Sequence, residues 1–458
     1  MIDVPAQPAV VAERRGALPV SERRLLLASL DLVAVAVAFV AAFNVRTSVA
    51  RDAGFYIPRL GTVIVCGLWL VAAQIADAYD LRTAVSTRAT ARVLLTALSM
   101  CFGGLLVTFL IVPYRITRPT LVLWLPFAAI TLFAGRYLYR RIFAGSFFAG
   151  RIALVTSSEA LETVWPEVSR NLGGLYRVVG LVDPSRADSG QRLRTVVEQR
   201  KVDQIVLGVR DEVSRDLFRD VLGCHDKGVT VRSLADLYEE LTGRLLLDQL
   251  GHTWLMSLPM RSNTSRLYAS VKRGVDVITG AVGLVLFAVI LLPIATLIKL
   301  EDRGPVFHRQ KRVGKYGHTF TLIKLRTMRA SSEAALVWAE KADPRITLIG
   351  RVLRKLHIDE LPQAWNVLVG DMSLVGPRPE QPHYVEELRR EIDFYNTRLT
   401  VRPGLTGWAQ VNHGYGSGVD GARVKLSYDL YYVKRQSVSL DLLILARTFL
   451  AVLSLKGT

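Results

Sequence analysis

The sequence predicts a membrane protein with three parts: a four-helix transmembrane bundle, a Rossmann-like parallel α/β domain, and a third domain that enters the membrane through a re-entrant helix. Three observations support this fold class. Half of the 458 residues are hydrophobic, and the mean hydropathy of +0.28 is high for a soluble enzyme. Long apolar runs fill the first third of the chain, and short apolar segments alternate with polar ones in the middle. A last apolar run, interrupted by a proline, precedes the most motif-rich part.

The net charge of +18 and a pI near 10.0 predict an anionic partner, either nucleic acid, a phospholipid surface or a phosphorylated substrate. The hydropathy argues against nucleic acid. Cys66, Cys101 and Cys224 lack CxxC spacing, so the sequence predicts neither a disulfide framework nor a zinc site.

After a cytoplasmic tail at residues 1–24, residues 25–141 are expected to form four transmembrane helices. Each apolar run is near the roughly 17 to 25 residues that a membrane helix needs. The runs are 25–43, 60–76, 93–112 and 121–139. A signal peptide cleaved after "TSVA" is an alternative interpretation, but the first run is longer than the apolar region of such a peptide.

Arginines predict the orientation of the bundle, because basic residues favour the cytoplasmic side of a membrane. The N-terminal tail, the second loop and the exit of the fourth span carry more of them than the opposite loops. We therefore expect both ends of the bundle in the cytoplasm, in a multi-pass membrane protein with its C-terminal domain on the cytoplasmic face. The first group is Arg14, Arg15, Arg23, Arg24, Arg82, Arg88, Arg92, Arg136, Arg140 and Arg141, against Arg46, Arg51, Arg59, Arg115 and Arg118.

Residues 150–256 are predicted to be the α/β domain. The apolar segments "RIALVTS", "YRVVGLVD", "VDQIVLGV" and "GVTVRSL" alternate with polar helical stretches, which is typical of a doubly wound parallel sheet. The first strand ends in "VTSSEA", without the G-x-G-x-x-G turn that brings backbone close to a dinucleotide. We therefore expect a regulatory or dimerising module, and a homodimer as the assembly.

A linker at 257–272 leads to a domain at 273–458, whose first segment, 275–300, is predicted to be the re-entrant helix. Pro293 lies inside this apolar run, where it removes a backbone hydrogen bond and clashes with the preceding turn, so we expect it to break the helix. Basic residues at both ends of the run also favour a return to the same face. The alternative is a full span that is kinked at Pro293.

Two motif groups in this domain gather basic residues. "PVFHRQKRVGKYGHTFTLIKLRTM" predicts a hairpin turning at Gly314 and Gly317, with cationic side chains available to one anionic ligand. Further on, prolines flank one arginine in "GPRP", and another stands in "RPGLTGW". The expected substrate-binding cations are Arg312, Lys324, Arg326, Arg378 and Arg402.

Between these groups lies an isolated acidic pair, Asp359 and Glu360, in "HIDELPQAW". The stretch "TLIGRVLRKL" before it has helical apolar spacing and predicts an amphipathic helix at a bilayer surface. Pro362 suits only the first turn of a helix, so Asp359 is expected near a helix N-terminus, which would keep its carboxylate ionised. Such a carboxylate can attack phosphorus or hold Mg²⁺. The alternative is that Asp359 only caps the helix and Glu360 is solvated.

An acidic pair surrounded by cations suits a diphosphate substrate and metal-assisted phosphoryl transfer. From about Val271 to Leu455 the chain resembles the bacterial polyprenyl-phosphate hexose-1-phosphate transferases, which are monotopic phosphoglycosyl transferases. The residues that carry the resemblance are "KRGVDV", the helix interrupted by Pro293, the hairpin, "HIDELPQAWNVLVGDMSLVGPRP", "RPGLTGWAQV" and "KLSYDLYYVKRQSVSLDLLIL". The four spans and the α/β domain resemble the long form of this family.

The resemblance implies transfer of hexose 1-phosphate from a UDP-hexose to undecaprenyl phosphate, with release of UMP, to begin a repeat unit of exopolysaccharide or O-antigen. It implies that Asp359 is the nucleophile of a covalent intermediate and contacts Mg²⁺, and that Glu360 assists it, for example by deprotonating the polyprenyl phosphate. The five cations would hold phosphates, metal-bound substrate or nucleotide. Leu292 stands where some members have serine before the proline. No residue identifies the hexose.

Two other functions stay open. A nucleotide-sugar oxidoreductase or dehydratase would use the α/β domain but would need the absent glycine-rich turn. A non-catalytic membrane scaffold of polysaccharide assembly would not need Asp359 beside clustered cations.

Overall fold

The computed structural model describes residues 20–49, 59–81, 83, 86–111, 118–143, 149–157, 162, 164–172, 175–186, 188–208, 214–247, 263–301, 303–329, 345–413 and 418–453. The chain forms two compact units, Met1–Leu237 and Tyr238–Thr458. The predicted cytoplasmic tail up to residue 19 and residues 248–262, which include most of the predicted linker, lie outside the described residues.

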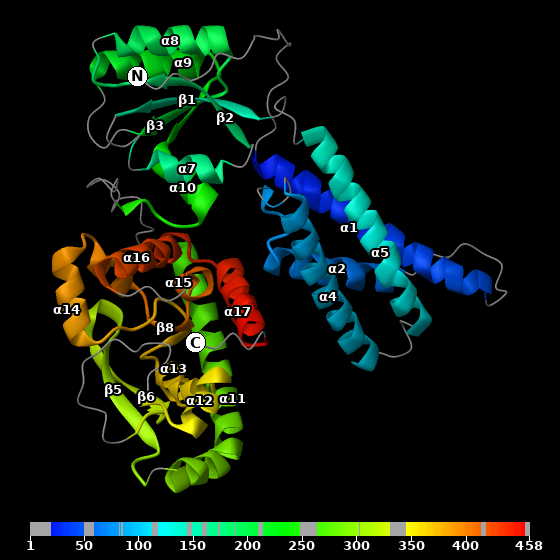
Figure 1. Ribbon diagram of the computed structural model, residues 1–458, viewed down its shortest axis with the longest axis vertical. Coiled ribbons are helices and arrows are strands. Elements are labelled where there is room, and N and C mark those ends of the chain that lie inside the picture. The colour runs from blue at the N-terminus through cyan, green and yellow to red at the C-terminus, as the bar shows by residue number, and fades with distance from the viewer. Residues whose placement is uncertain are drawn as a thin grey trace. The chain divides into compact units, whose positions relative to one another are not determined.

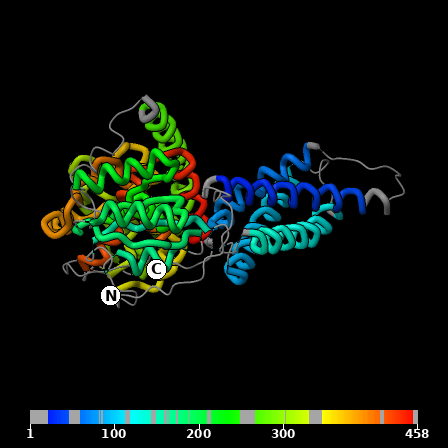
Figure 2. Tube along the Cα trace, turned by 90° about the horizontal axis from the view of Figure 1, so that it is seen from above, coloured from blue at the N-terminus to red at the C-terminus, as the bar shows by residue number. Residues whose placement is uncertain are grey.

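The first unit begins with the four predicted helices, which pack together as a bundle (Figure 2). Three of them contain stretches long and apolar enough to cross a membrane, whereas α2 is a shorter apolar helix of 17 residues. The protein is therefore a membrane protein. The helices are α1 (Val20–Val49), α2 (Arg59–Ile75), α4 (Thr87–Ile111) and α5 (Arg118–Phe143).

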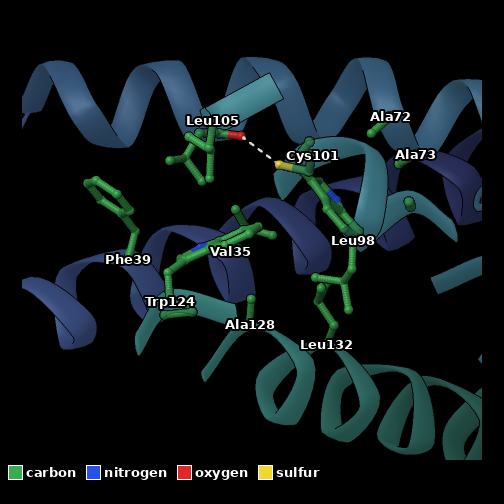
Figure 3. Packing of buried hydrophobic residues seen from close by; sticks show 14 of the residues in the cluster. Val35, Phe39, Ala72, Ala73, Leu98, Cys101, Leu105, Trp124, Ala128 and Leu132 are labelled. Carbon is green, nitrogen blue, oxygen red and sulfur yellow. Dashed lines mark hydrogen bonds between the residues drawn. The ribbon is translucent and has the colours of Figure 1, made fainter. Parts of the chain in front are cut away.

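Large apolar side chains such as Phe39, Leu98 and Trp124 fill the bundle interior (Figure 3). Others, such as Val63 and Ile130, are more than two-thirds exposed on the outside, as expected of helices that face lipid. One buried ion pair, with 2.5 Å between Arg136 Nη2 and an Asp31 carboxylate oxygen, joins α5 to α1. Removing one partner would leave the other charge uncompensated in an apolar interior, so the pair ties these helices together.

The predicted parallel α/β domain follows. Its four strands are all parallel, in the order β2-β1-β3-β4, with α8 and α9 on one face of the sheet and α7 on the other (Figure 1). No glycine follows directly where β1 ends at Thr156. The elements are β1 (Gly150–Thr156), α7 (Trp165–Asn171), β2 (Tyr176–Val182), α8 (Ser189–Arg200), β3 (Gln204–Gly208), α9 (Arg215–Asp226), β4 (Thr230–Ser233) and α10 (Leu234–Thr242).

The second unit contains α11 (Asn263–Glu301), which corrects two expectations. The helix begins inside the predicted linker, because Lys272 and Arg273 find partners elsewhere in the unit: Asp441 for the first, and the carbonyls of Val367 and Leu368 for the second. It also continues through Pro293 without interruption. Figure 1 shows α11 changing direction towards its C-terminal end. A proline removes one hydrogen bond and crowds the preceding turn, which bends a helix without having to end it.

The rest of the second unit is compact and mixed. The predicted hairpin is confirmed as antiparallel β5 and β6, whose turn has Gly317 at φ 83°. Two short strands, β7 and β8, pair in parallel. The elements are β5 (Phe307–Val313), η3 (Lys315–Gly317), β6 (Thr319–Leu325), α12 (Leu348–Lys355), η5 (Ile358–Gln363), α13 (Ala364–Val369), β7 (Ser373–Val375), α14 (Pro382–Glu391), η6 (Tyr395–Thr400), β8 (Gly404–Thr406), α15 (Trp408–Asn412), α16 (Gly418–Arg435) and α17 (Val438–Leu453).

The predicted amphipathic helix is also confirmed. Leu353 of α12 is buried, while Leu348 and Val352 are 72% and 57% exposed beside exposed Arg351. The carboxylate of Glu301, at the end of α11, accepts hydrogen bonds from the first two backbone N–H groups of α12. Since these groups have no partner inside the helix, Glu301 joins the two helices end to end.

The N-terminal half of α11 packs against β7 and α13, which follow the acidic pair in the chain. Asp276 is 2% exposed and accepts hydrogen bonds from the Ser373 hydroxyl and the Leu374 backbone, both in β7. A side chain at Gly280 would come within 3.2 Å of the α13 backbone, so glycine allows α11 and α13 to approach closely. The third part of the protein is thus built on α11.

Candidate active site

The acidic pair lies in the 3₁₀ helix η5, close to β6. Asn366, at the start of α13, fastens this region to the hairpin: its side chain donates to the Thr321 carbonyl and accepts from the Ile323 backbone. Pro362 falls inside η5, before α13 begins, which suits a residue without an N–H donor. Asp359 therefore lies at a helix start, as predicted.

Glu360 is held by two cations from different parts of the chain. Its Oε1 lies 2.9 Å from Nζ of Lys324 in β6 and 3.1 Å from Nη2 of Arg378 in the loop after β7. Burial alone would raise the pKa of Glu360, but the charges of Lys324 and Arg378 outweigh it and hold the pKa far below its usual range. The Glu360 carboxylate is thus ionised and its position is fixed.

The surroundings of Asp359 are different. It is 8% exposed, and no hydrogen bond or ion pair joins its carboxylate to another residue in the part of the chain that the structure describes. Burial, and next the charge of Glu360, raise its pKa above the usual range. This direction is opposite to the expected effect of the helix terminus, because burial and the neighbouring acid outweigh it. The capping alternative is wrong, since His357 is the residue before η5.

The five predicted cations have different surroundings. Lys324 and Arg378 converge on the acidic pair, as described. Arg312 donates to Gln310 and, at 2.9 Å, to the Pro379 carbonyl, and lies 3.6 Å from Glu380. Arg326 is buried, with 4% of its surface exposed.

The backbone of Arg402 packs closely against a neighbouring segment of the site. Its carbonyl oxygen would lie 2.3 Å from a side chain added at Gly376, so the segments around these two residues pack backbone against backbone. The Arg402 side chain is half-buried, and it makes no ion pair with any residue within the described ranges. The structure therefore brings two of the five side chains to the acidic pair.

The Pro-Arg-Pro segment is held through its carbonyl groups. Buried Arg398 donates to the Arg378 carbonyl at 2.9 Å and pairs with Asp429 at 2.7 Å, while Arg312 holds the next carbonyl. The sequence analysis did not single out Arg398 or Asp429, which lie more than 30 residues apart and carry no motif spacing. These contacts fix the backbone from which the Arg378 side chain reaches Glu360.

Two further side chains act on Asp359 and were not predicted. Arg354 and His357 each lower the pKa of the Asp359 carboxyl, against the larger effects of burial and Glu360. His357 has a left-handed backbone with φ 54°, which turns the chain between α12 and η5. The signal available in the sequence was their closeness to the acidic pair.

A magnesium site was also predicted at Asp359. Within the described ranges no group of three or more His, Cys, Asp or Glu side chains is placed to hold a metal ion. Mg²⁺ commonly takes only one or two carboxylates and completes its shell with water and substrate phosphates. Asp359, a buried carboxylate without a hydrogen-bond or ion-pair partner among the described residues, fits that mode of binding rather than an all-protein metal cage.

The fold and the site together define a class: a membrane protein whose last part carries a buried carboxylate pair facing cations, a setting suited to anionic, phosphate-bearing molecules. Residues 267–455 match the model of the bacterial sugar transferase family. The chain belongs to this family, because similarity to its members extends over most of the chain.

Three relatives illustrate the similarity. The UDP-glucose:undecaprenyl-phosphate glucose-1-phosphate transferase of Xanthomonas campestris pv. campestris is 30% identical over 394 residues, 79% of this chain and 81% of the relative. The UDP-N-acetylgalactosamine-undecaprenyl-phosphate N-acetylgalactosaminephosphotransferase of Aeromonas hydrophila is 43% identical over 256 residues, 56% of this chain and 60% of the relative. The undecaprenyl-phosphate glucose phosphotransferase of Komagataeibacter xylinus is 30% identical, over 73% of this chain and 66% of its own length.

Proposed function

We propose that the protein transfers a sugar 1-phosphate from a UDP-sugar to undecaprenyl phosphate and releases UMP. The names of the relatives support this reaction class. The structural observation that carries it is the contrast within the acidic pair: Glu360 pairs with Lys324 and Arg378, whereas the buried Asp359 carboxylate makes no ion pair within the described ranges. A carboxylate that is not engaged by such pairs is available to react.

In the first step, an Asp359 oxygen attacks the phosphorus atom that bears the sugar. The bond from this phosphorus to the oxygen bridging the two phosphates breaks, and UMP leaves with that oxygen and its electron pair. In the second step, a phosphate oxygen of undecaprenyl phosphate attacks the same phosphorus. The aspartyl bond breaks, which restores the Asp359 carboxylate and forms the lipid-linked diphosphate sugar. Two displacements let a soluble donor and a lipid acceptor react in turn.

Mg²⁺ is part of the proposal, with Asp359 as the residue that would hold it. When bound, the ion would neutralise charge on the diphosphate. Magnesium binding can be tested apart from turnover, by calorimetric titration of Mg²⁺ in the presence of UDP, with the wild type compared with Asp359→Asn.

Glu360 is proposed to orient Lys324 and Arg378 rather than to act as a base. Two ion pairs at 2.9 and 3.1 Å hold both cations at Glu360, the residue next to Asp359, before substrate arrives. Preorganised charges of this kind stabilise developing negative charge at little reorganisation cost. A doubly paired carboxylate is also a weak proton acceptor. Arg312, Arg326 and Arg402 stay predicted substrate contacts, of which Arg312 has the strongest claim to a supporting role through Pro379.

The re-entrant arrangement of α11 is proposed for access to both substrates. Large apolar side chains along its C-terminal half, among them Val285, Val289 and Leu292, are 66%, 75% and 77% exposed, which suits contact with lipid. If the helix returns to the cytoplasmic face of the bacterial plasma membrane, Asp359 can meet a soluble UDP-sugar and a lipid phosphate at one interface. Dimerisation through the α/β domain stays a prediction.

The test uses the purified full chain with undecaprenyl phosphate and a panel of UDP-sugars. Since the relatives are named for glucose and for N-acetylgalactosamine, the panel includes both donors, with galactose and N-acetylglucosamine. We expect UMP release with one donor, and a phospho-sugar adduct on Asp359 when acceptor is withheld. Asp359→Asn should abolish both, and Asp393→Asn, at an exposed position, should not. A scaffold would release no UMP, and an adduct on another residue would contradict the assignment.

A further inference from the structure

Outside the acidic pair, the second unit contains another polar cluster, in which three helices meet. Tyr268 and Lys272 come from α11, Tyr432 from α16 and Asp441 from α17 (Figure 1). Asp441 Oδ2 accepts hydrogen bonds from Tyr268 Oη and Lys272 Nζ, both at 2.8 Å. Its Oδ1 accepts from Tyr432 Oη, also at 2.8 Å. One carboxylate thus gathers three donors.

The surroundings of this cluster are apolar. Tyr432 is 1% exposed, and Val375, Trp408 and Ile444 pack around it. Charged groups in such an environment lose their hydration, so an ion pair there contributes little net stability relative to apolar residues of similar size. The main effect of the ion pair is to orient the side chains, because the hydrogen bonds restrict each partner to a few conformations.

The cluster is joined to the Pro-Arg-Pro segment through Tyr432. Its hydroxyl oxygen lies 3.3 Å from the carbonyl of Val375, the last residue of β7, and 3.2 Å from Lys272 Nζ. Because Lys272 donates to the hydroxyl oxygen, the single hydroxyl proton points to the side of Asp441 and the Val375 carbonyl, with the shorter contact, 2.8 Å, to Asp441. Arg378, which reaches Glu360, follows three residues after Val375.

The backbone between these two residues is well suited to transmit a displacement. The Gly376 N–H donates to the Thr406 carbonyl at 2.8 Å, and Pro377 accepts from the Gly404 N–H at 2.9 Å. Side chains added at Gly376 or Gly404 would clash with backbone atoms nearer than 2.5 Å. A close-packed segment of this kind shifts as one body, so a change at Val375 reaches Arg378.

We propose that Tyr432 and Asp441 are positioning residues, which act through the Val375 carbonyl to hold Arg378 in place beside the acidic pair. Lys272 connects α11 to the same hydrogen-bond network, so the position of this helix and the geometry of the site depend on each other. The proposal rests on the proposed function for its effect on catalysis. Its effect on the backbone does not depend on that function.

The first experiment measures amide hydrogen exchange in the full chain purified in detergent, with wild type compared with Tyr432→Phe. Loss of one hydroxyl should speed exchange at the Gly376 amide about tenfold, the effect of weakening a local hydrogen-bonded structure by roughly one hydrogen bond. Amides of the β5–β6 hairpin should not change. The matched control is Tyr428→Phe, one turn earlier on α16, where the ring contacts Arg244 and His413.

The second experiment is a double-mutant cycle on UMP release. Tyr432→Phe alone should lower kcat about tenfold with little change in KM for the UDP-sugar, because the hydroxyl touches no substrate. In an Arg378→Lys background the same substitution should cost less than about twofold, since Arg378 is the group through which it acts. Equal losses in both backgrounds would overturn the positioning role.

A third variant approaches the cluster from α11, which covers the case in which Tyr432→Phe fails to fold. Lys272→Met keeps the length of the side chain and removes its charge, and should also speed exchange at Gly376. Unchanged exchange at Gly376, or equally faster exchange throughout residues 263–453, would overturn the proposal. Local exchange changes in a protein that releases no UMP would support the positioning role and refute the proposed function instead.

Discussion

Replacement of Glu360 by Gln distinguishes the two roles open to this acid. A base that deprotonates undecaprenyl phosphate acts only in the second step, when the acceptor is present. A carboxylate that orients Lys324 and Arg378 acts in both steps, because both cations are paired with the residue next to Asp359 before either substrate binds. Formation of the Asp359 adduct in the absence of acceptor therefore reports on orientation alone.

The expected size of the effect follows from the two ion pairs. A hydrogen bond to a charged group contributes about 1.5–3 kcal/mol when well shielded. The side chains of Lys324 and Arg378 are 21% and 35% exposed, so solvent screens part of this, and Gln retains a neutral acceptor oxygen. A net loss of about 2 kcal/mol corresponds to about a 30-fold slower first step.

The assay is single-turnover: enzyme is mixed with radiolabelled UDP-sugar and no acceptor, and labelled protein is measured against time. Glu386→Gln is the matched control, because Glu386 also pairs with two arginines, on the exposed face of α14, where such pairs contribute little. Normal adduct formation by Glu360→Gln, combined with slow transfer to lipid, would refute the orienting role and favour the base.

Three further predictions concern pH, packing and topology. Burial would raise the pKa of Glu380, but the charges of Lys425 and then Arg398 outweigh burial and lower the pKa below 4.5. The ionised Glu380 should therefore stabilise the folded protein fully above pH 4.5, and this stabilisation should be lost as the pH falls through the lowered pKa. Between pH 7 and pH 3, the Tm of Glu380→Gln should fall less than the Tm of the wild type. Gly404→Ala should lower Tm sharply, because the new Cβ would lie 2.1 Å from the Gly376 nitrogen; an unchanged Tm would contradict this packing. Pro293→Ala removes about 3 kcal/mol of helix penalty, so some molecules should become full spans, with tags at residues 265 and 458 labelled from opposite sides. Labelling of the wild-type C-terminus only from outside would overturn the re-entrant proposal.

The sequence by itself determined the elements whose signals are local. Runs of apolar residues located the bundle helices, and alternation of short apolar and polar segments located all four strands of the parallel sheet. Gly314 and Gly317 located the hairpin turn, in which Gly317 adopts a φ of 83° that favours glycine. The acidic pair was found in the same way, as an Asp-Glu dipeptide between two groups of basic residues.

Local sequence signals did not predict the extent of α11, because contacts with distant parts of the chain determine it. Pro293 predicted a break, yet α11 runs through it, because contacts of the whole helix decide whether a proline ends it or bends it. The first residues of α11 were predicted to belong to a linker, although Lys272 among them has a partner about 170 residues away.

The roles of the cations were decided only by tertiary structure. Arg312, Lys324 and Arg378 look alike in the sequence, but one supports a backbone carbonyl and two hold Glu360. Tertiary structure also makes the two acids differ: Glu360 forms two ion pairs, whereas Asp359 forms none with the residues that the structure describes. Adjacent residues share their sequence environment, whereas the charges that reach each side chain come from β6 and from the loop after β7, and only folding brings those segments together.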